Sequence, residues 1–145
     1  MKVSELIGPK LAQWVALALG YVVVKDGDLP DAPLVVYTPD GDVHSFSDTV
    51  GWRPDIQWDR GGPIIDREGI DIWQDPNWNH GQVGTNRFLA GIGVHAETFN
   101  YSERTEGAPV IEADHTQSGE TRLQAAMRCV VASEYGEEVP DANGA

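Results

Sequence analysis

The spacing of apolar residues predicts a helix near the start of the chain. Apolar side chains recur at the interval of one helix face, at Leu11, Trp14, Val15, Ala18 and Leu19. Pro9 suits a first helical position, where its missing N–H is not needed, and Gly20 suits a C-terminal cap. We therefore expect a helix over residues 9–19.

A second stripe of the same kind predicts a helix near the end of the chain. Its apolar positions are Leu123, Ala126, Met127, Val130 and Val131. Thr121 is placed to cap its start, Gly136 closes it, and Pro140 prevents its continuation. This helix is expected over residues 121–135.

Between the two helices, β-branched and aromatic residues predict short strands at 21–25, 34–38 and 43–46, and a longer strand at 88–99. The turn Pro39-Asp40-Gly41-Asp42 predicts a hairpin, and Gly91 and Gly93 indicate a bulge. The polar residues 100–118 are expected to form an exposed connection. The fold class is therefore α+β: a small, mainly antiparallel sheet with the N- and C-terminal helices on one face. We expect one domain over residues 1–140 and a disordered tail at 141–145.

The stretch over residues 52–68 is the most unusual part of the chain. It combines two tryptophans with Pro54, Pro63 and the pair Gly61-Gly62. Prolines fix φ, and glycines permit sharp changes of direction, so we expect an ordered loop rather than a regular helix. The loop would lead into a short strand at residues 64–65. Its tryptophans either line a pocket or simply bury apolar surface beneath the loop.

Composition excludes several classes of partner. The net charge is −13 and the 145 residues include only ten lysines and arginines. A nucleic-acid binder needs a basic footprint, and an anionic membrane would repel this surface, so neither partner is expected. The acidity either keeps the protein in solution or mimics DNA toward a DNA-binding partner.

The cysteine content and the hydropathy of the chain indicate the cellular compartment in which the protein resides. A lone Cys129 excludes an internal disulfide and a thiolate metal cluster, and within a helix it is expected to be a buried apolar residue. The apolar residues 11–24 are too few and too mixed to cross a bilayer, and no secretory signal is evident. A cytoplasmic protein is expected.

Catalytic patterns are weak. The histidines are scattered, at His44, His80, His95 and His115, without the short spacings of a metal site. His95 beside Glu97 is a candidate general base. The pairs Asp66 with Glu68 and Asp71 with Asp75 are candidates for holding a divalent ion or for acid–base chemistry. We expect no metal or cofactor, and a small hydrolase ranks third among the functions considered.

Two stretches carry a family resemblance. One is W-x-P-x-x-x-W-x-x-G-G-P-I-I-D-R-E-x-I over residues 52–70, and the other is L-x-A-A-M-R-x-x-V-A-S-x-Y-G-E-E-V over residues 123–139. Together with residues 3–8 and 11–16, they resemble the NinX-like family of phage and prophage proteins, a domain of unknown function. Residues 71–118 are not covered, and Arg122 stands where relatives commonly carry a proline before the last helix. The resemblance implies a phage-encoded accessory protein in the cytoplasm of a bacterial host and no particular biochemical activity.

The residues around the central stretch then suggest capture of a small ligand without catalysis. Trp52 and Trp58 would stack on a base, and the amides of Gly61 and Gly62 would bind an anionic group. The full candidate site is Trp52, Arg53, Pro54, Trp58, Arg60, Gly61, Gly62, Pro63 and Arg67. We expect a nucleotide-like ligand and a counter-defence role, with an acidic DNA mimic that inhibits a host DNA-binding or restriction protein as the alternative. Assembly into a homo-oligomer is left open.

Overall fold

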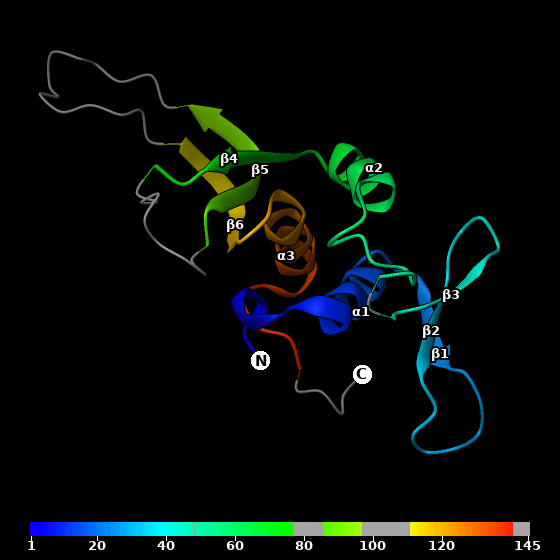
Figure 1. Cartoon of the computed structure of the whole chain (residues 1–145). Coiled ribbons are helices and arrows are strands. Elements are labelled where there is room, and N and C mark those ends of the chain that lie inside the picture. The colour runs from blue at the N-terminus through cyan, green and yellow to red at the C-terminus, as the bar shows by residue number, and fades with distance from the viewer. Residues whose placement is uncertain (48, 77–85, 97–110, 141–145) are drawn as a thin grey trace, which may run out of the picture.

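The computed structural model describes residues 1–47, 49–76, 86–96 and 111–140, and Figure 1 shows their arrangement. Within these residues the chain forms, in order, a 3-10 helix η1 (Val3–Glu5), α1 (Gly8–Ala18), β1 (Val22–Lys25), β2 (Leu34–Tyr37), β3 (Val43–Ser45), α2 (Trp58–Glu68), β4 (Ile70–Gln74), β5 (Phe88–Ala96), β6 (Ile111–Gly119) and α3 (Arg122–Tyr135). None of the described helices is long and apolar enough to cross a membrane.

The α+β class with antiparallel strands and a helix near each end is confirmed. The strands form two three-stranded antiparallel sheets rather than one, in the orders β1-β2-β3 and β4-β5-β6. Figure 1 shows α3 packed against the β4-β5-β6 sheet, with α1 between α3 and the β1-β2-β3 sheet. The single-domain division at residue 140 stays a prediction, and the tail at 141–145 lies outside the described residues.

Helix α3 is the centre of the hydrophobic core. Nine of its fourteen residues are buried, and it contacts both other helices and all three strands of the β4-β5-β6 sheet. Its predicted caps are confirmed. The Thr121 hydroxyl accepts a hydrogen bond from the Gln124 N–H at 3.1 Å, and the Gly136 N–H donates to the Ala132 carbonyl at 2.8 Å.

A buried arginine ties α3 to two distant segments. The Arg128 Nε donates to the Leu6 carbonyl at 3.0 Å, and its Nη1 donates to the Ser118 carbonyl at 2.9 Å. Burial lowers the pKa of Arg128, although its guanidinium stays protonated at neutral pH. The two bonds fix the lead-in to α1 and the end of β6 on the same helix.

The two ends of the described chain also pair with each other. The Val3 N–H donates to the Glu137 carbonyl at 2.9 Å, and the Val139 N–H donates to the Met1 carbonyl at 2.9 Å. An isolated antiparallel bridge joins Lys2 to Glu138. The first and last described residues therefore lie side by side.

The predicted hairpin is confirmed. Strands β2 and β3 pair with Val36 opposite His44, and the Thr38 N–H donates to the Asp42 carbonyl at 3.0 Å across the turn. Gly41 has a φ of 89°, which suits glycine. The predicted bulge at Gly91 and Gly93 is also present, since the β5–β6 register shifts on both sides of Ile92.

Residues 111–119 correct the expectation of an exposed connection, because they form strand β6 along β5. The sequence of β6 is polar, and its sheet membership depends on backbone hydrogen bonds that hydropathy does not report. Close packing also contributes: a Cβ on Gly91 would lie 2.4 Å from the Ala113 Cβ. Strand β4, which has no counterpart among the predicted strands, completes this sheet.

Residues 58–68 of the stretch expected to be a loop with a strand at residues 64–65 instead form helix α2, with Pro63 inside it, whereas residues 52–57 form the expected loop. A proline removes one helical hydrogen bond and is unfavourable there. Burial of Ile64 and Gly61 offsets that loss, and Gly69 ends the helix in the left-handed conformation at φ 67°. The expectation of no regular helix was therefore wrong, because tertiary packing outweighs local propensity.

The adjacent glycines of α2 have opposite environments. A Cβ on Gly61 would lie 2.4 Å from the Pro54 carbonyl oxygen and 2.6 Å from Leu123 Cδ2. A Cβ on Gly62 would meet no atom within 4 Å. Gly61 therefore lets α2 approach the preceding loop and α3, whereas Gly62 only leaves the outer helix surface bare.

Substituting the two glycines separately tests this packing. Gly61→Ala should lower the free energy of unfolding by about 2 kcal/mol or more, because backbone must shift to admit the methyl group. Gly62→Ala should raise it by about 0.5–1 kcal/mol, since alanine favours the helix without a clash. Urea denaturation of both variants measures the difference, and equal effects would contradict the close approach at Gly61.

Removing the guanidinium of Arg128 should be strongly destabilising. Arg128→Met keeps an apolar stem but leaves the Leu6 and Ser118 carbonyls without their donors, so we expect a loss of about 3 kcal/mol in urea denaturation. Lys25→Met removes an exposed cation from β1 and should change stability by under about 0.5 kcal/mol. Similar losses in the two variants would show that the Arg128 bonds contribute nothing.

The buried thiol of Cys129 should make the protein less stable at high pH. Burial raises the pKa of its thiol to about 12, from 9.0 for an unperturbed group. Above about pH 9 the unfolded thiol loses its proton while the folded thiol keeps it, so the free energy of unfolding should fall by about 1.4 kcal/mol per pH unit. Cys129→Ala should lack this contribution when the two proteins are denatured in parallel between pH 8 and 10.5. Matching slopes would contradict it.

Candidate functional site

Helix α2 separates two surface grooves, and six of the nine predicted site residues divide between them. The hairpin groove has a volume of about 350 Å³ and is lined by Tyr21, Thr38, Pro39, Asp40, Trp52, Asp59, Arg60, Pro63, Ile64 and Arg67. The strand groove has a volume of about 410 Å³ and is lined by Trp58, Gly62, Ile65, Asp66, Gly69, Ile70, Asp71 and Ile72. The predicted single site is thus two surfaces on opposite sides of one helix.

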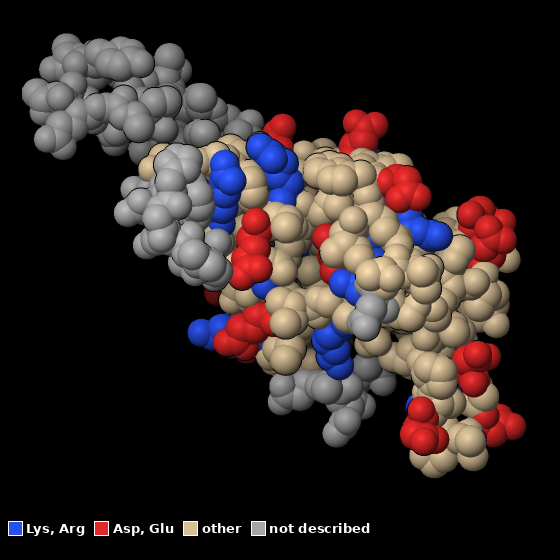
Figure 2. Space-filling view, in the orientation of Figure 1, with Lys and Arg blue, Asp and Glu red and all other residues tan. Residues whose placement is uncertain are grey.

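The hairpin groove receives two arginines from one face of α2. Arg60 and Arg67 are seven residues apart, which is two helical turns, so both side chains border the groove. Arg67 also lies 3.7 Å from the neighbouring Glu68, in a pair that is largely exposed and therefore weak. Figure 2 shows basic side chains beside acidic ones around α2.

The opposite wall of the hairpin groove comes from the β2–β3 turn. The Thr38 hydroxyl donates to the Asp40 carboxylate, and the Asp42 N–H donates to it at 3.3 Å. These bonds, the first above all, lower the pKa of Asp40, so the carboxylate is ionised across the neutral range. The groove thus offers guanidinium donors on one wall and a carboxylate acceptor on the other.

Aromatic rings form the base of the hairpin groove. Trp52 is buried, with its ring centroid 5.7 Å from that of Tyr21 and 6.3 Å from that of Phe46, both in edge-on contact. The backbone N–H of Trp52 donates to the Ser45 carbonyl at 2.7 Å. Trp52 is therefore mainly a core residue, and the half-buried Tyr21 is the more accessible ring in this groove. Tyr21 was absent from the predicted site because it lies 31 residues before Trp52 in the chain.

Arg53 and Pro54 support the site rather than line either groove. The Arg53 Nε and Nη2 each donate to the Asp55 carboxylate at 2.8 Å, and both side chains are buried. Pro54 is fully buried, and its carbonyl faces Gly61. Their expected ligand role is replaced by a structural one, because a buried bidentate ion pair keeps the guanidinium away from the surface.

Gln57 completes this support and was not predicted. Its side-chain amide donates to the carbonyls of Thr49 and Gly51, at 3.1 and 2.9 Å, and its side-chain oxygen accepts from the Arg53 N–H at 3.1 Å. One side chain thus holds residues 49–53 against the start of α2. A polar residue directly before a helix is the only signal that could have indicated this role.

The amides of Gly61 and Gly62 do not form the expected anion-binding nest. The Gly61 N–H donates to the Gln57 carbonyl at 2.8 Å, and Gly62 lies within α2, where N–H groups bond to the preceding turn. Trp58 is 57% exposed and borders the strand groove, so it cannot stack with Trp52 on one ligand in the hairpin groove.

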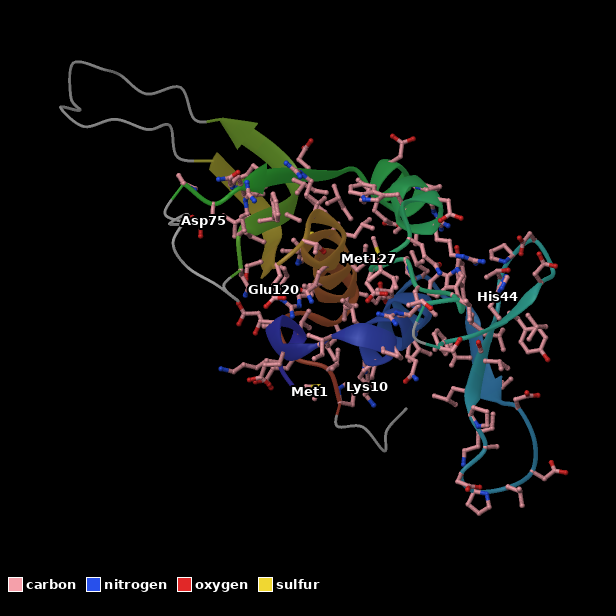
Figure 3. The ribbon with its side chains drawn as sticks, in the orientation of Figure 1. Met1, Lys10, His44, Asp75, Glu120 and Met127 are labelled. Carbon is pink, nitrogen blue, oxygen red and sulfur yellow. The ribbon has the colours of Figure 1, made fainter. Side chains whose placement is uncertain are left out.

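A cluster with metal-ligand geometry lies on the hairpin turn. One ligand atom from each of Asp40, Asp42 and His44 lies within 4.8 Å of the others, and Figure 3 labels His44 there. This Asp-x-Asp-x-His pattern was not predicted, because the candidates named from the sequence were histidine spacings and other carboxylate pairs. Exposed acidic groups often gather without a metal, so proximity alone does not define a metal site.

The catalytic candidates remain separate. Asp66 and Asp71 border the strand groove, Glu68 lies beside Arg67, and no metal-ligating cluster of described residues includes them. His80, Glu97 and the side chain of His95 lie outside the described residues. Within the described residues, neither predicted carboxylate pair therefore lies together with a general base.

Comparison with known proteins identifies the family. The sequence model of the family described as "Bacteriophage P22, NinX" matches residues 2–134. A search of curated proteins finds no match. The matched range includes the motif at residues 52–70, most of the motif at residues 123–139, and residues 71–118, which the motif resemblance does not cover. The chain therefore belongs to the phage NinX family.

Proposed function

We propose that this phage-encoded accessory protein binds a small, nucleotide-like anion in the hairpin groove and holds it without chemical change. The observation that carries the proposal is that Tyr21, Arg60 and Arg67, from distant parts of the sequence, border one groove of about 350 Å³. Ligand sites in proteins have volumes of this order and combine apolar walls with a few polar groups.

The arginines supply the charge that such a ligand requires. Arg60 and Arg67 are two of only ten basic residues in a chain with a net charge of −13. A phosphate accepts bidentate hydrogen bonds from a guanidinium, which a lysine cannot provide. Two such groups on one helix face suit a phosphate or diphosphate along the groove.

The remaining walls suit the rest of a nucleotide. The Asp40 and Asp59 carboxylates can accept hydrogen bonds from ribose hydroxyls or a base amino group. Tyr21 and Pro63 offer flat faces to a base. This mixture of cations and acceptors selects a ligand with both an anionic group and donors, rather than inorganic phosphate alone.

Sequestration of such a ligand suits a counter-defence role, in which the phage protein removes a nucleotide signal made by the host. The DNA-mimic alternative rests on the acidic composition and stays a prediction. Figure 2 shows the Asp and Glu side chains of this face as separate groups rather than a continuous row, so this face does not favour that alternative over ligand capture.

Calorimetry with a panel of cyclic dinucleotides, cyclic trinucleotides, ADP-ribose derivatives and inorganic phosphate tests the proposal. At least one nucleotide should bind, and Arg67→Ala and Arg60→Ala should each weaken it about tenfold or more, because a charge-assisted contact is lost. Native mass spectrometry should recover the nucleotide with its mass unchanged.

The matched control is Lys10→Ala, which removes one cation from α1; Figure 3 labels Lys10 away from α2. It should leave both affinity and melting temperature unchanged. Equal weakening by Lys10→Ala would indicate a nonspecific effect of net charge. Failure of every nucleotide to bind, with a folded protein, would overturn the proposal.

A further inference from the structure

We propose that the strand groove binds an extended, basic segment of a partner protein, which joins β4 as an added strand. The groove lies on the other side of α2 from the hairpin groove and shares no lining residue with it. The inference is therefore independent of the proposed nucleotide binding.

Strand β4 lies at one edge of its sheet. Among the described strands, β4 pairs with β5 alone. The Asp75 N–H donates to the Arg87 carbonyl at 2.8 Å, and hydrogen-bonded pairs alternate along an antiparallel ladder. The backbone groups of Ile70, Ile72 and Gln74 therefore point away from β5. They form the row of donors and acceptors that an added strand uses.

The groove beside this edge has space for a side chain of a partner. Trp58 stands at its border with 57% of its surface exposed, and exposed tryptophans are frequent anchors of protein interfaces. Gly62 follows one helical turn later, and no atom lies within 4 Å of where its Cβ would be. The missing side chain leaves space next to the indole for an apolar side chain of the partner.

The strand groove carries negative charge from two aspartates. Asp66 and Asp71 are exposed on opposite sides of the groove, one on α2 and one on β4, and neither carboxylate forms an ion pair with a described residue. A lysine or arginine in the added strand would lie between them. A second copy of this chain would instead bring further carboxylates to the groove and add to the repulsion of a net charge of −13. The charges therefore favour a basic partner over self-association.

The test presents the whole protein with a library of random decapeptides and measures the affinity of enriched peptides by fluorescence anisotropy. Enriched peptides should carry lysine or arginine between apolar residues. Methylating one alternate set of their backbone amides should abolish binding, and methylating the other set should leave it, because only one set faces β4. Lack of enrichment for basic peptides, or equal binding by both methylated forms, would overturn the proposal.

Three variants locate the binding. Trp58→Ala and Asp71→Lys should each weaken the enriched peptides about tenfold or more, and Gly62→Leu should do the same by filling the groove. The matched controls are Leu29→Ala, which truncates another exposed apolar side chain, between β1 and β2, and Asp28→Lys, the same charge change on that loop. Both controls should bind as the original protein does.

Sedimentation of the protein alone tests whether a second copy of the chain occupies the groove instead. We expect a monomer whose state does not change in Trp58→Ala. Self-association that Trp58→Ala abolishes would overturn the proposal and assign the groove to a second copy. Unchanged peptide affinity in all three groove variants, with each variant folded, would overturn it as well.

Discussion

The enclosure of α3 is the constraint on which the rest of this structure depends. A helix that is buried on nearly every side needs partners on every side, and the chain supplies them from segments far apart in sequence. Small side chains such as Ala125, Ala126 and Cys129 let these partners approach closely. The Arg128 guanidinium then specifies the arrangement, because its two acceptors are carbonyls of the N-terminal lead-in and of β6.

The position of α2 follows from that packing. Gly61 fits it against α3, and the Arg53–Asp55 pair and Gln57 hold the loop that precedes it. Because only one side of α2 is buried, its two flanks remain on the surface and carry different chemistry. One flank presents arginines toward an aromatic base, and the other presents a tryptophan and carboxylates toward a strand edge.

The sequence was informative where local patterns and tertiary packing agree. The stripes of the terminal helices, the Thr121 cap and the turn at Pro39-Asp40-Gly41-Asp42 each have a local physical cause, and each was predicted. The α2 helix was missed because Pro63 and two glycines oppose helix formation locally, and only burial against α3 compensates. Likewise, the two arginines of the hairpin groove were predicted, but the division into two grooves depends on helix phase, which a predicted loop does not have.

The pairing of the chain ends has a consequence for biosynthesis. The Val3 N–H donates to the Glu137 carbonyl, and the Leu6 carbonyl accepts a hydrogen bond from the guanidinium of Arg128. In a nascent chain, residues 3–6 are therefore made well before their partners, and Leu6 precedes Arg128 by 122 residues. These contacts can form only after residues 128–139 have left the ribosome, so until then α1 exposes apolar surface that chaperones of the host can recognise.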